Sequence, residues 1–139
     1  MPTFAFDILN NKTIKILMFK LLFYVAIGAF ILFVLLPRLR NASPTHKKNL
    51  REMAEGGALL LDVRSPTEHA SGHIFGSLNI PVQSLNSQIG QLPTDKTIPI
   101  IVYCASGMRS GTAAAMLTAN GYSNVTNGGG YSDLAAVLG

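Results

Sequence analysis

Cysteine, tryptophan and charged residues are scarce in this chain of 139 residues. It has one cysteine and no tryptophan, and only 13% of its residues are charged. A single cysteine cannot form a disulfide within the chain, so the cysteine count leaves the redox compartment open. Three histidines are scattered along the sequence and show, with that cysteine, no spacing typical of metal ligands. The sequence therefore predicts neither an internal disulfide nor a metal site.

The excess of positive charge is confined to the N-terminal third. Residues 1–44 hold five lysines and arginines against one aspartate, whereas residues 45–139 hold six basic and six acidic groups. The formal net charge of +4 therefore belongs to the N-terminal segment. A C-terminal part without a basic excess has no net charge to attract a phosphate backbone, so the composition argues against nucleic-acid binding.

One long hydrophobic run occupies residues 16–36. As a helix it would span about 31 Å, close to the hydrocarbon thickness of a bilayer, and its one charge, Lys20, lies near an end. A cleaved signal peptide is the alternative, but residues 37–41, which begin with Pro37, form a poor cleavage site and predict a sharp end to the run. We expect a single-pass anchor in the lipid bilayer at 16–36, after an N-terminal segment at 1–15 and before a linker at 37–44.

The basic residues that flank this run bear on its orientation. Three lie on or before its N-terminal part and five lie after it: Lys12, Lys15 and Lys20, then Arg38, Arg40, Lys47, Lys48 and Arg51. Positive charge favours the cytoplasmic side of a membrane. The count of five against three predicts a cytoplasmic C-terminal domain, with an extracytoplasmic domain as the alternative.

Beyond the linker, apolar runs alternate with amphipathic stretches and turn residues. We expect strands at 58–63, 77–80, 98–103 and 124–126. Helices are expected at 46–55, with Thr45 as its cap, at 82–92, from about 112 to 120, and at 132–138. Strands that alternate with helices predict an α/β sandwich with a small, mainly parallel sheet.

The only cysteine, Cys104, lies where an apolar strand ends and a short loop rich in glycine and serine begins. A strand–loop–helix turn directs backbone N–H groups and the positive end of the helix toward one concavity, which suits an anion. A cysteine placed there should lose its proton readily, and Arg109 adds a fixed positive charge. Cys104 is therefore a candidate nucleophile, although a lone cysteine after a strand is also often a small buried hydrophobic residue.

Three motifs between residues 45 and 139 resemble the rhodanese (sulfurtransferase) family. The first is Cys104-Ala-Ser-Gly-Met-Arg109-Ser-Gly, which resembles the family's active-site loop. The second runs from Leu61-Asp62-Val63-Arg64 through Gly72-His73-Ile74 to Pro81, and the third is Asn127-Gly128-Gly129-Gly130-Tyr131. The resemblance implies a single rhodanese-like domain with a three-layer α/β sandwich, and it does not extend to the first 40 or so residues.

The resemblance also implies a reaction that needs no cofactor. Cys104 would accept a sulfane sulfur from a small donor anion such as thiosulfate, forming a persulfide. It would then pass that sulfur to a thiophilic acceptor, which could be cyanide, a small thiol or a protein cysteine. The loop residues would bind the donor and stabilise its charge: Ala105, Ser106, Gly107, Met108, Arg109 and Ser110.

Residues of the second motif are expected to support the site. Asp62 resembles the family's strand-end aspartate, which orients the active-site loop through hydrogen bonds, and Arg64 is a second supporting residue. Arg64 and Glu68 are four positions apart, so we expect these two to pair with each other.

The histidines are expected to have no catalytic role. A nucleophile that is already a thiolate needs no base, so His73 is expected to make a structural hydrogen bond. His46 and His69 are interpreted as surface residues.

Two other functions are possible on this fold. A cysteine-dependent phosphatase of the related dual-specificity class carries five residues between its cysteine and arginine, whereas four separate Cys104 from Arg109. A membrane-tethered binding module without turnover is the non-enzymatic alternative. Ala105 stands where many thiosulfate-using members carry a basic residue, which leaves the natural donor open.

Overall fold

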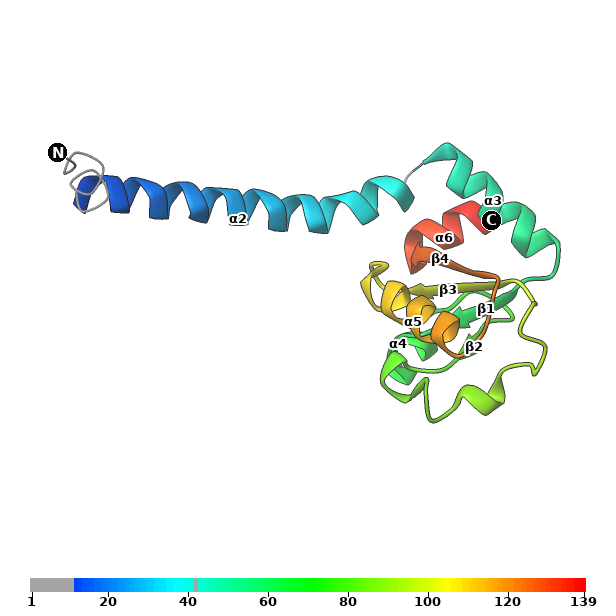
Figure 1. Ribbon diagram of the computed structural model, residues 1–139. Coiled ribbons are helices and arrows are strands. Elements are labelled where there is room, and N and C mark those ends of the chain that lie inside the picture. Colours follow the sequence, from blue (N-terminus) through cyan, green and yellow to red (C-terminus); the bar gives the residue numbers. More distant parts are fainter. Residues whose placement is uncertain (1–11, 42) are drawn as a thin grey trace. The chain divides into compact units, whose positions relative to one another are not determined.

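A computed structural model describes residues 12–41 and 43–139 (Figure 1). The chain divides into two units, with the boundary between Leu39 and Arg40. Helix α2 (Lys12–Asn41) contains the whole described part of the first unit, and its last two residues fall in the second. Most of the N-terminal segment predicted at 1–15 lies outside the described residues.

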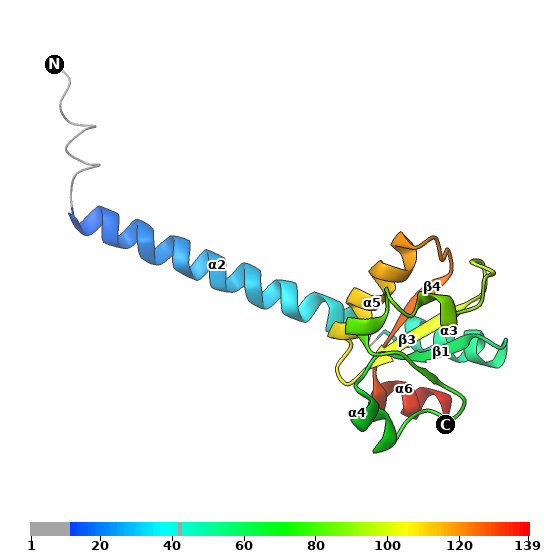
Figure 2. The ribbon, with the colours of Figure 1, turned by 90° about the horizontal axis from the view of Figure 1, so that it is seen from below.

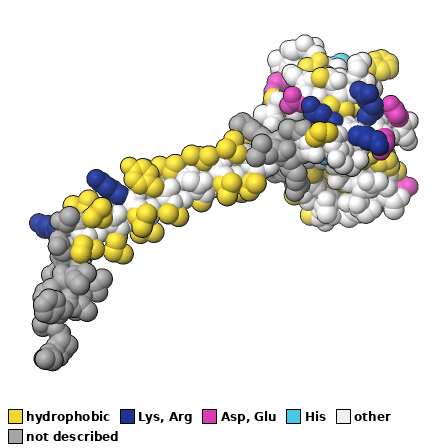
Figure 3. Space-filling model, turned by 90° about the horizontal axis from the view of Figure 1, so that it is seen from above, with side chains coloured by type: hydrophobic (Ala, Val, Ile, Leu, Met, Phe, Trp, Pro, Cys, Tyr) yellow, Lys and Arg dark blue, Asp and Glu magenta, His cyan; other side chains and the backbone are white. Residues whose placement is uncertain are grey.

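Helix α2 is apolar around its whole circumference. Its part between Ile14 and Leu36 is long and apolar enough to cross a membrane, and none of it is buried by the rest of the chain. Figure 3 shows hydrophobic side chains along this helix. The apolar part ends at Leu36, directly before Pro37, while the backbone stays helical to Asn41. A proline removes one backbone donor, but the residues that follow it can still donate to the preceding turn.

The second unit alternates short helices with four strands. Its elements are α3 (Pro44–Glu55), β1 (Leu59–Asp62), α4 (Pro66–Ala70), β2 (Leu78–Asn79), the 3₁₀ turns η1 (Val82–Ser84) and η2 (Ile89–Gln91), β3 (Ile100–Cys104), α5 (Met108–Ala119), β4 (Val125–Gly130) and α6 (Tyr131–Leu138). This order confirms the predicted α/β class.

The four strands form one parallel sheet in the order β2-β1-β3-β4. Asp62, the last residue of β1, is paired with Tyr103, which directly precedes Cys104 at the end of β3. Because the strands are parallel, their carboxyl ends meet at one edge of the sheet, where ligands of open α/β sheets bind. The pairing of Asp62 with Tyr103 therefore brings the second motif close to the cysteine loop, as the sequence predicts.

The side chains of β3 alternate between two hydrophobic cores. Ile100, Val102 and Cys104 belong to a core that also contains Ala113 and Leu117 of α5. Ile101 and Tyr103 belong to the second, which α3 and α6 close with Leu50, Leu134 and Val137. Successive residues of a strand point to opposite faces, so one central strand supplies both cores. Figures 1 and 2 show α5 on one side of the sheet and α6 on the other, which confirms the three-layer sandwich.

Two local predictions are wrong. Helix α3 begins at Pro44 with Ser43 as its N-cap residue, not after a Thr45 cap, because proline is favoured in the first helical position, where its missing N–H is not needed. The helix predicted at 82–92 is replaced by η1 and η2. Serine side chains there compete with backbone N–H groups for the carbonyl oxygens that a helix would use. The hydroxyl of Ser87, for example, donates to the Ser84 carbonyl at 2.9 Å.

Strand β4 extends further than predicted, through its glycines to Gly130. A Cβ atom at Gly128 would come within 2.8 Å of the Ile101 side chain, and one at Gly130 within 2.8 Å of the Ala105 carbonyl oxygen. The glycines therefore let β4 approach both β3 and the loop that follows it.

Candidate active site

The structure places Cys104 at the carboxyl end of β3, fully buried under the loop that follows it. Its Sγ accepts a hydrogen bond from the backbone N–H of Gly107 at 3.1 Å and lies 3.6 Å from the Ser110 hydroxyl oxygen. Burial raises the pKa of the thiol, but the Ser110 hydroxyl and the backbone N–H groups of Ser110, Ser106 and Gly107 outweigh burial, so the pKa is lowered. These donors stabilise a thiolate.

The loop that follows the buried sulfur has mostly exposed residues at its start. Ala105, Ser106 and Met108 are exposed, whereas Gly107 is partly buried. Gly107 is the N-cap residue of α5 with φ of +90°, a left-handed conformation that glycine adopts without strain. This turn allows the N–H of Gly107 to reach back to Sγ before α5 begins.

Asn127 of β4 is a site residue to which the sequence assigned no role. Its Nδ2 donates to the Gly107 carbonyl at 3.1 Å, and its Oδ1 accepts from the Ser110 hydroxyl at 2.8 Å. It belongs to the third motif, which was the only signal of its importance. The contacts themselves depend on the pairing of β3 with β4, which brings the two segments together.

Arg109 forms a bidentate ion pair with Glu68 of α4. Both N···O distances are 2.8 Å, and both side chains are about one-third exposed. The Arg109 guanidinium holds the pKa of Glu68 well below its usual range. Glu68 also accepts from the backbone N–H of Ser65, and so completes a capping box at the start of α4. This ion pair joins the second motif to the cysteine loop.

The predicted pair between Arg64 and Glu68 is wrong. Helix α4 begins at Pro66, so Arg64 precedes it and the four-residue spacing is not a helical turn. Arg64 instead binds Asp62, with its closest contact at 2.7 Å, and donates to the Gly72 carbonyl at 2.7 Å. Its guanidinium also lies 4.5 Å from the centre of the Tyr131 ring.

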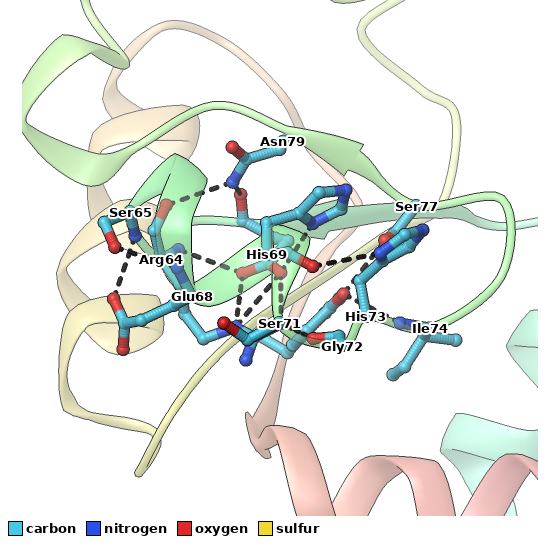
Figure 4. Close-up of polar contacts among 12 residues, drawn as sticks. Arg64, Ser65, Glu68, His69, Ser71, Gly72, His73, Ile74, Ser77 and Asn79 are labelled. Carbon is cyan, nitrogen blue, oxygen red and sulfur yellow. Dashed lines mark hydrogen bonds and ion pairs between the residues drawn. The ribbon is translucent and has the colours of Figure 1, made fainter.

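Asp62 is fully shielded from solvent. Figure 4 shows its partners Arg64 and His69 within the polar network that follows β1. The Asp62 carboxylate accepts from the backbone N–H and the guanidinium of Arg64, and from His69 Nδ1 at 2.9 Å. Burial raises the pKa of Asp62, but these hydrogen bonds outweigh burial and lower it. Among the described residues, the hydrogen bonds of the Asp62 carboxylate go to Arg64 and His69, which both belong to the second motif.

Each of the three histidines makes a hydrogen bond within the domain. His69 is largely buried against Asp62, so its assignment to the surface is wrong. His73 makes the expected structural hydrogen bond, from Nδ1 to the His69 carbonyl at 3.0 Å, and its ring stacks on that of His69. His46 is also partly buried and its Nε2 donates to the Asn127 carbonyl at 3.2 Å. Among residues 12–41 and 43–139, no cluster of side chains is arranged to hold a metal ion.

This geometry agrees with the comparison to protein families. The model of the rhodanese-like domain matches residues 45–136. The chain belongs to the rhodanese family. The match includes the Cys104 loop, the Asp62 network and Asn127, which are the three parts of the site.

Relatives of the chain include named sulfurtransferases. It is 37% identical over 75 residues to thiosulfate sulfurtransferase PspE of Escherichia coli, covering 54% of this chain and 72% of that protein. It is also 37% identical over 79 residues to thiosulfate:glutathione sulfurtransferase of Saccharomyces cerevisiae, where the match covers 49% of this chain and 57% of the yeast protein. The chain is a transferase of the rhodanese type.

Solved structures share the fold of the second unit. A rhodanese from E. coli with anions is 35% identical with a TM-score of 0.54, covering 57% of this chain and 93% of that one. The human single-domain sulfurtransferase TSTD1 is 30% identical with a TM-score of 0.55, covering 64% of this chain and 91% of that one. The rhodanese fold accounts for nearly the whole of both structures.

Proposed function

We propose that this protein moves a sulfane sulfur from a donor such as thiosulfate to a thiophilic acceptor through a persulfide on Cys104. The observation that carries the proposal is the environment of Sγ, which lies at the carboxyl end of β3 with the N–H of Gly107 and the hydroxyl of Ser110 directed at it. Donors of this kind stabilise negative charge on sulfur, which is present in both the thiolate and the persulfide.

In the first step, the Cys104 thiolate attacks the outer sulfur of the donor. A bond forms between Sγ and that sulfur while the donor's S–S bond breaks, and the electron pair leaves with the remainder, which is sulfite when the donor is thiosulfate. The product is an enzyme persulfide whose terminal sulfur is negative. The hydrogen bonds that lower the thiol pKa therefore also serve the intermediate.

In the second step, a thiophilic acceptor attacks the terminal sulfur. The bond between Sγ and that sulfur breaks, the sulfur leaves with the acceptor, and the thiolate is restored. Because Cys104 is the only cysteine of this chain, no second thiol of the same chain can attack the persulfide. The acceptor is therefore another molecule: cyanide in an assay, a small thiol or a cysteine of a second protein.

The loop backbone is the principal anion site in this proposal. Arg109 was expected to bind the donor, but its planar fork is occupied by Glu68. Its charge still acts on the sulfur, since a negative Cys104 helps to raise the pKa of Arg109, after the larger effect of the Glu68 bond. Arg109 is thus held by Glu68 beside the position where charge develops, and backbone N–H groups make the direct contacts.

The test is intact-mass measurement of the full-length protein in detergent. Thiosulfate should add the mass of one sulfur atom, and cyanide should remove it again. If no donor adds sulfur, the binding-module alternative explains the fold better than turnover does. Release of phosphate from an aryl phosphate, without any sulfur adduct, would instead favour the phosphatase.

Replacing Arg109 should weaken use of an anionic donor. We expect Arg109→Ala to raise the KM for thiosulfate about tenfold, because it removes a positive charge that lies beside the donor site and is only one-third exposed. Arg109→Lys should be intermediate, since lysine keeps the charge but loses the planar fork. Steady-state kinetics measure the effect, with Arg51→Ala as the control because Arg51 binds the Val137 carbonyl. An unchanged KM would exclude this role.

We also propose that α2 anchors the protein in a membrane with the rhodanese domain on the cytoplasmic side. The support is the length and apolar surface of Ile14–Leu36, and the five basic residues after it against three before it or in its N-terminal part. We expect full-length protein, with its N-terminal mass intact, in membranes washed with carbonate. A mature form that lacks α2 would identify a signal peptide, and protease protection in vesicles of known sidedness would decide the orientation.

A further inference from the structure

One side chain, that of Asn127, contacts two groups that donate hydrogen bonds to the sulfur of Cys104. Its Nδ2 donates to the carbonyl of Gly107, whose own N–H donates to Sγ. Its Oδ1 accepts from the hydroxyl of Ser110, which is also within reach of Sγ. A residue of β4 therefore holds two donors of a loop that lies between β3 and α5.

The orientation of the Asn127 amide is set by the backbone. Oδ1 accepts from the N–H of Gly129 at 2.9 Å, and Nδ2 faces the carbonyl of Gly107, which can only accept. An amide turned by 180° would place a donor against a donor at Gly129 and an acceptor against an acceptor at Gly107. The acceptor atom of Asn127 is therefore kept on the side of Ser110.

The Ser110 hydroxyl has one proton and two acceptors within reach. Asn127 Oδ1 lies 2.8 Å away and Cys104 Sγ lies 3.6 Å away. A neutral thiol leaves the proton with the nearer oxygen, whereas a negative sulfur attracts it, because an ionised acceptor forms the stronger hydrogen bond. Oδ1 keeps the N–H of Gly129 in both cases, so turning the hydroxyl leaves no acceptor unpaired.

A bulge in the sheet places Asn127 in this position. Val102 pairs with Asn127, but the next residue of β3, Tyr103, pairs with Gly129, so Gly128 is an extra residue in β4. A side chain at Gly128 would meet Ile101 within 2.8 Å. Glycine at position 128 permits the bulge, and the bulged part of β4 carries Asn127 against the cysteine loop.

We propose that Asn127 is a positioning residue for sulfur transfer: it holds the Gly107 N–H toward the sulfur of Cys104, and it keeps the Ser110 hydroxyl beside that sulfur, so that the hydroxyl proton turns to the sulfur when the sulfur is negative. Its part in turnover rests on the proposed persulfide chemistry. Its effect on the free thiol does not, because the thiolate has the same contacts without any sulfur donor. The two proposals can therefore fail separately.

The experiment is alkylation of the full-length protein in detergent by iodoacetamide, followed by intact mass over a pH series. With one cysteine in the chain, the rate reports on Cys104 alone. Asn127→Asp has nearly the same size but replaces the donor to Gly107 with an oxygen and adds a negative charge near the sulfur. We expect alkylation below the thiol pKa to be about tenfold slower in this variant, with a smaller decrease for Asn127→Ala.

The matched control is Asn120→Asp, because Asn120 is exposed at the end of α5 and donates to the Met116 carbonyl. It adds the same charge away from the loop and should leave the alkylation profile unchanged. Other charged or titratable groups around the loop are the same in every variant: Arg109 with Glu68, Asp133 beside Gly130, and His46 on the Asn127 carbonyl.

A double variant tests the route through the hydroxyl. If Asn127 acts partly through Ser110, then Asn127→Ala combined with Ser110→Ala should slow alkylation by less than the product of the two single effects.

A purely structural role would lower the melting temperature of Asn127→Asp while its alkylation profile matched that of the wild type, and this result would overturn the proposal. If Asn127→Asp does not fold, Asn127→Ser is measured in its place, with the same two readouts. Absence of a sulfur adduct on the wild type, with alkylation still slowed in the variants, would refute the persulfide proposal and leave the positioning of the thiol intact.

Discussion

Cys104→Ser should abolish sulfur transfer while the domain stays folded. A serine hydroxyl is not ionised near neutral pH and cannot form the persulfide, so we expect turnover to fall by about 10³-fold or more, to the level of the uncatalysed reaction. The fold should persist, since serine is close in size to cysteine and can still accept from the Gly107 N–H at the same place. Intact mass after thiosulfate should show no added sulfur.

Two outcomes would contradict this expectation. Turnover near the wild-type rate in Cys104→Ser would show that Cys104 is not the nucleophile. A circular-dichroism melt that lost its cooperative transition would show instead that the buried cysteine is mainly structural. Ser106→Ala is the matched control in the same loop: it removes an exposed hydroxyl but keeps the backbone N–H that acts on the sulfur, so it should keep both the sulfur adduct and the melt.

Asp62→Asn should have the largest effect on stability. Asp62 is fully buried and Arg64 is nearly so, and the substitution leaves the guanidinium buried without its charged partner. We expect the free energy of unfolding to fall by about 3–5 kcal/mol, the range measured when one member of a buried ion pair is removed. Denaturant unfolding followed by circular dichroism measures the loss, with Asp95→Asn as the control at an exposed loop position.

A second substitution separates charge from packing at this position. Replacing Arg64 by methionine in the Asp62→Asn background removes the unpaired charge, so the double variant should be more stable than Asp62→Asn alone. If the double variant were less stable by the full sum of the single effects, the two residues would not act as a pair, and the loss would reflect packing against Tyr131 and the contact with Gly72.

The same carboxylate predicts a dependence of stability on pH. The folded state lowers the pKa of Asp62 from an ordinary value of 3.8. A lowered folded pKa contributes stability that is fully present above the unfolded pKa and is lost as the pH falls through the folded value. We therefore expect the free energy of unfolding of the wild type to decrease as the pH falls below about 4. Asp62→Asn should lack this part of the acid dependence.

Much of the fold could be predicted because it depends on local patterns. Four strands and their order of alternation with helices follow from apolar runs separated by turn residues, and all four were expected close to their observed positions. The helix predicted at 82–92 is wrong because two local patterns in that stretch conflict. Leu85 and Leu92 are buried at a spacing that suits a helix, but the serines between the apolar positions and Gly90 favour turns.

The partners of the charged side chains could be predicted less well. Arg64 and Glu68 are near neighbours in sequence, yet they bind different partners, Asp62 and Arg109 respectively. A four-residue spacing brings side chains together only on a helix, and Arg64 precedes the first turn of α4. Glu68 and Arg109 are 41 positions apart, and no local pattern connects residues at that distance.

The sequence by itself determined the apolar helix, the strands of a parallel sheet, and the short loop that joins Cys104 at a strand end to the next helix, because each depends on residues within a few positions of one another. Only the tertiary structure decided what surrounds the sulfur. The pairing of β3 with β4 and the bulge at Gly128 bring Asn127 against Gly107 and Ser110, across 17 to 20 positions of chain. Hydrogen bonds between such distant groups form only when the sheet has set the strands side by side, and this is why the side chain that positions the donors around Cys104 emerged from the fold.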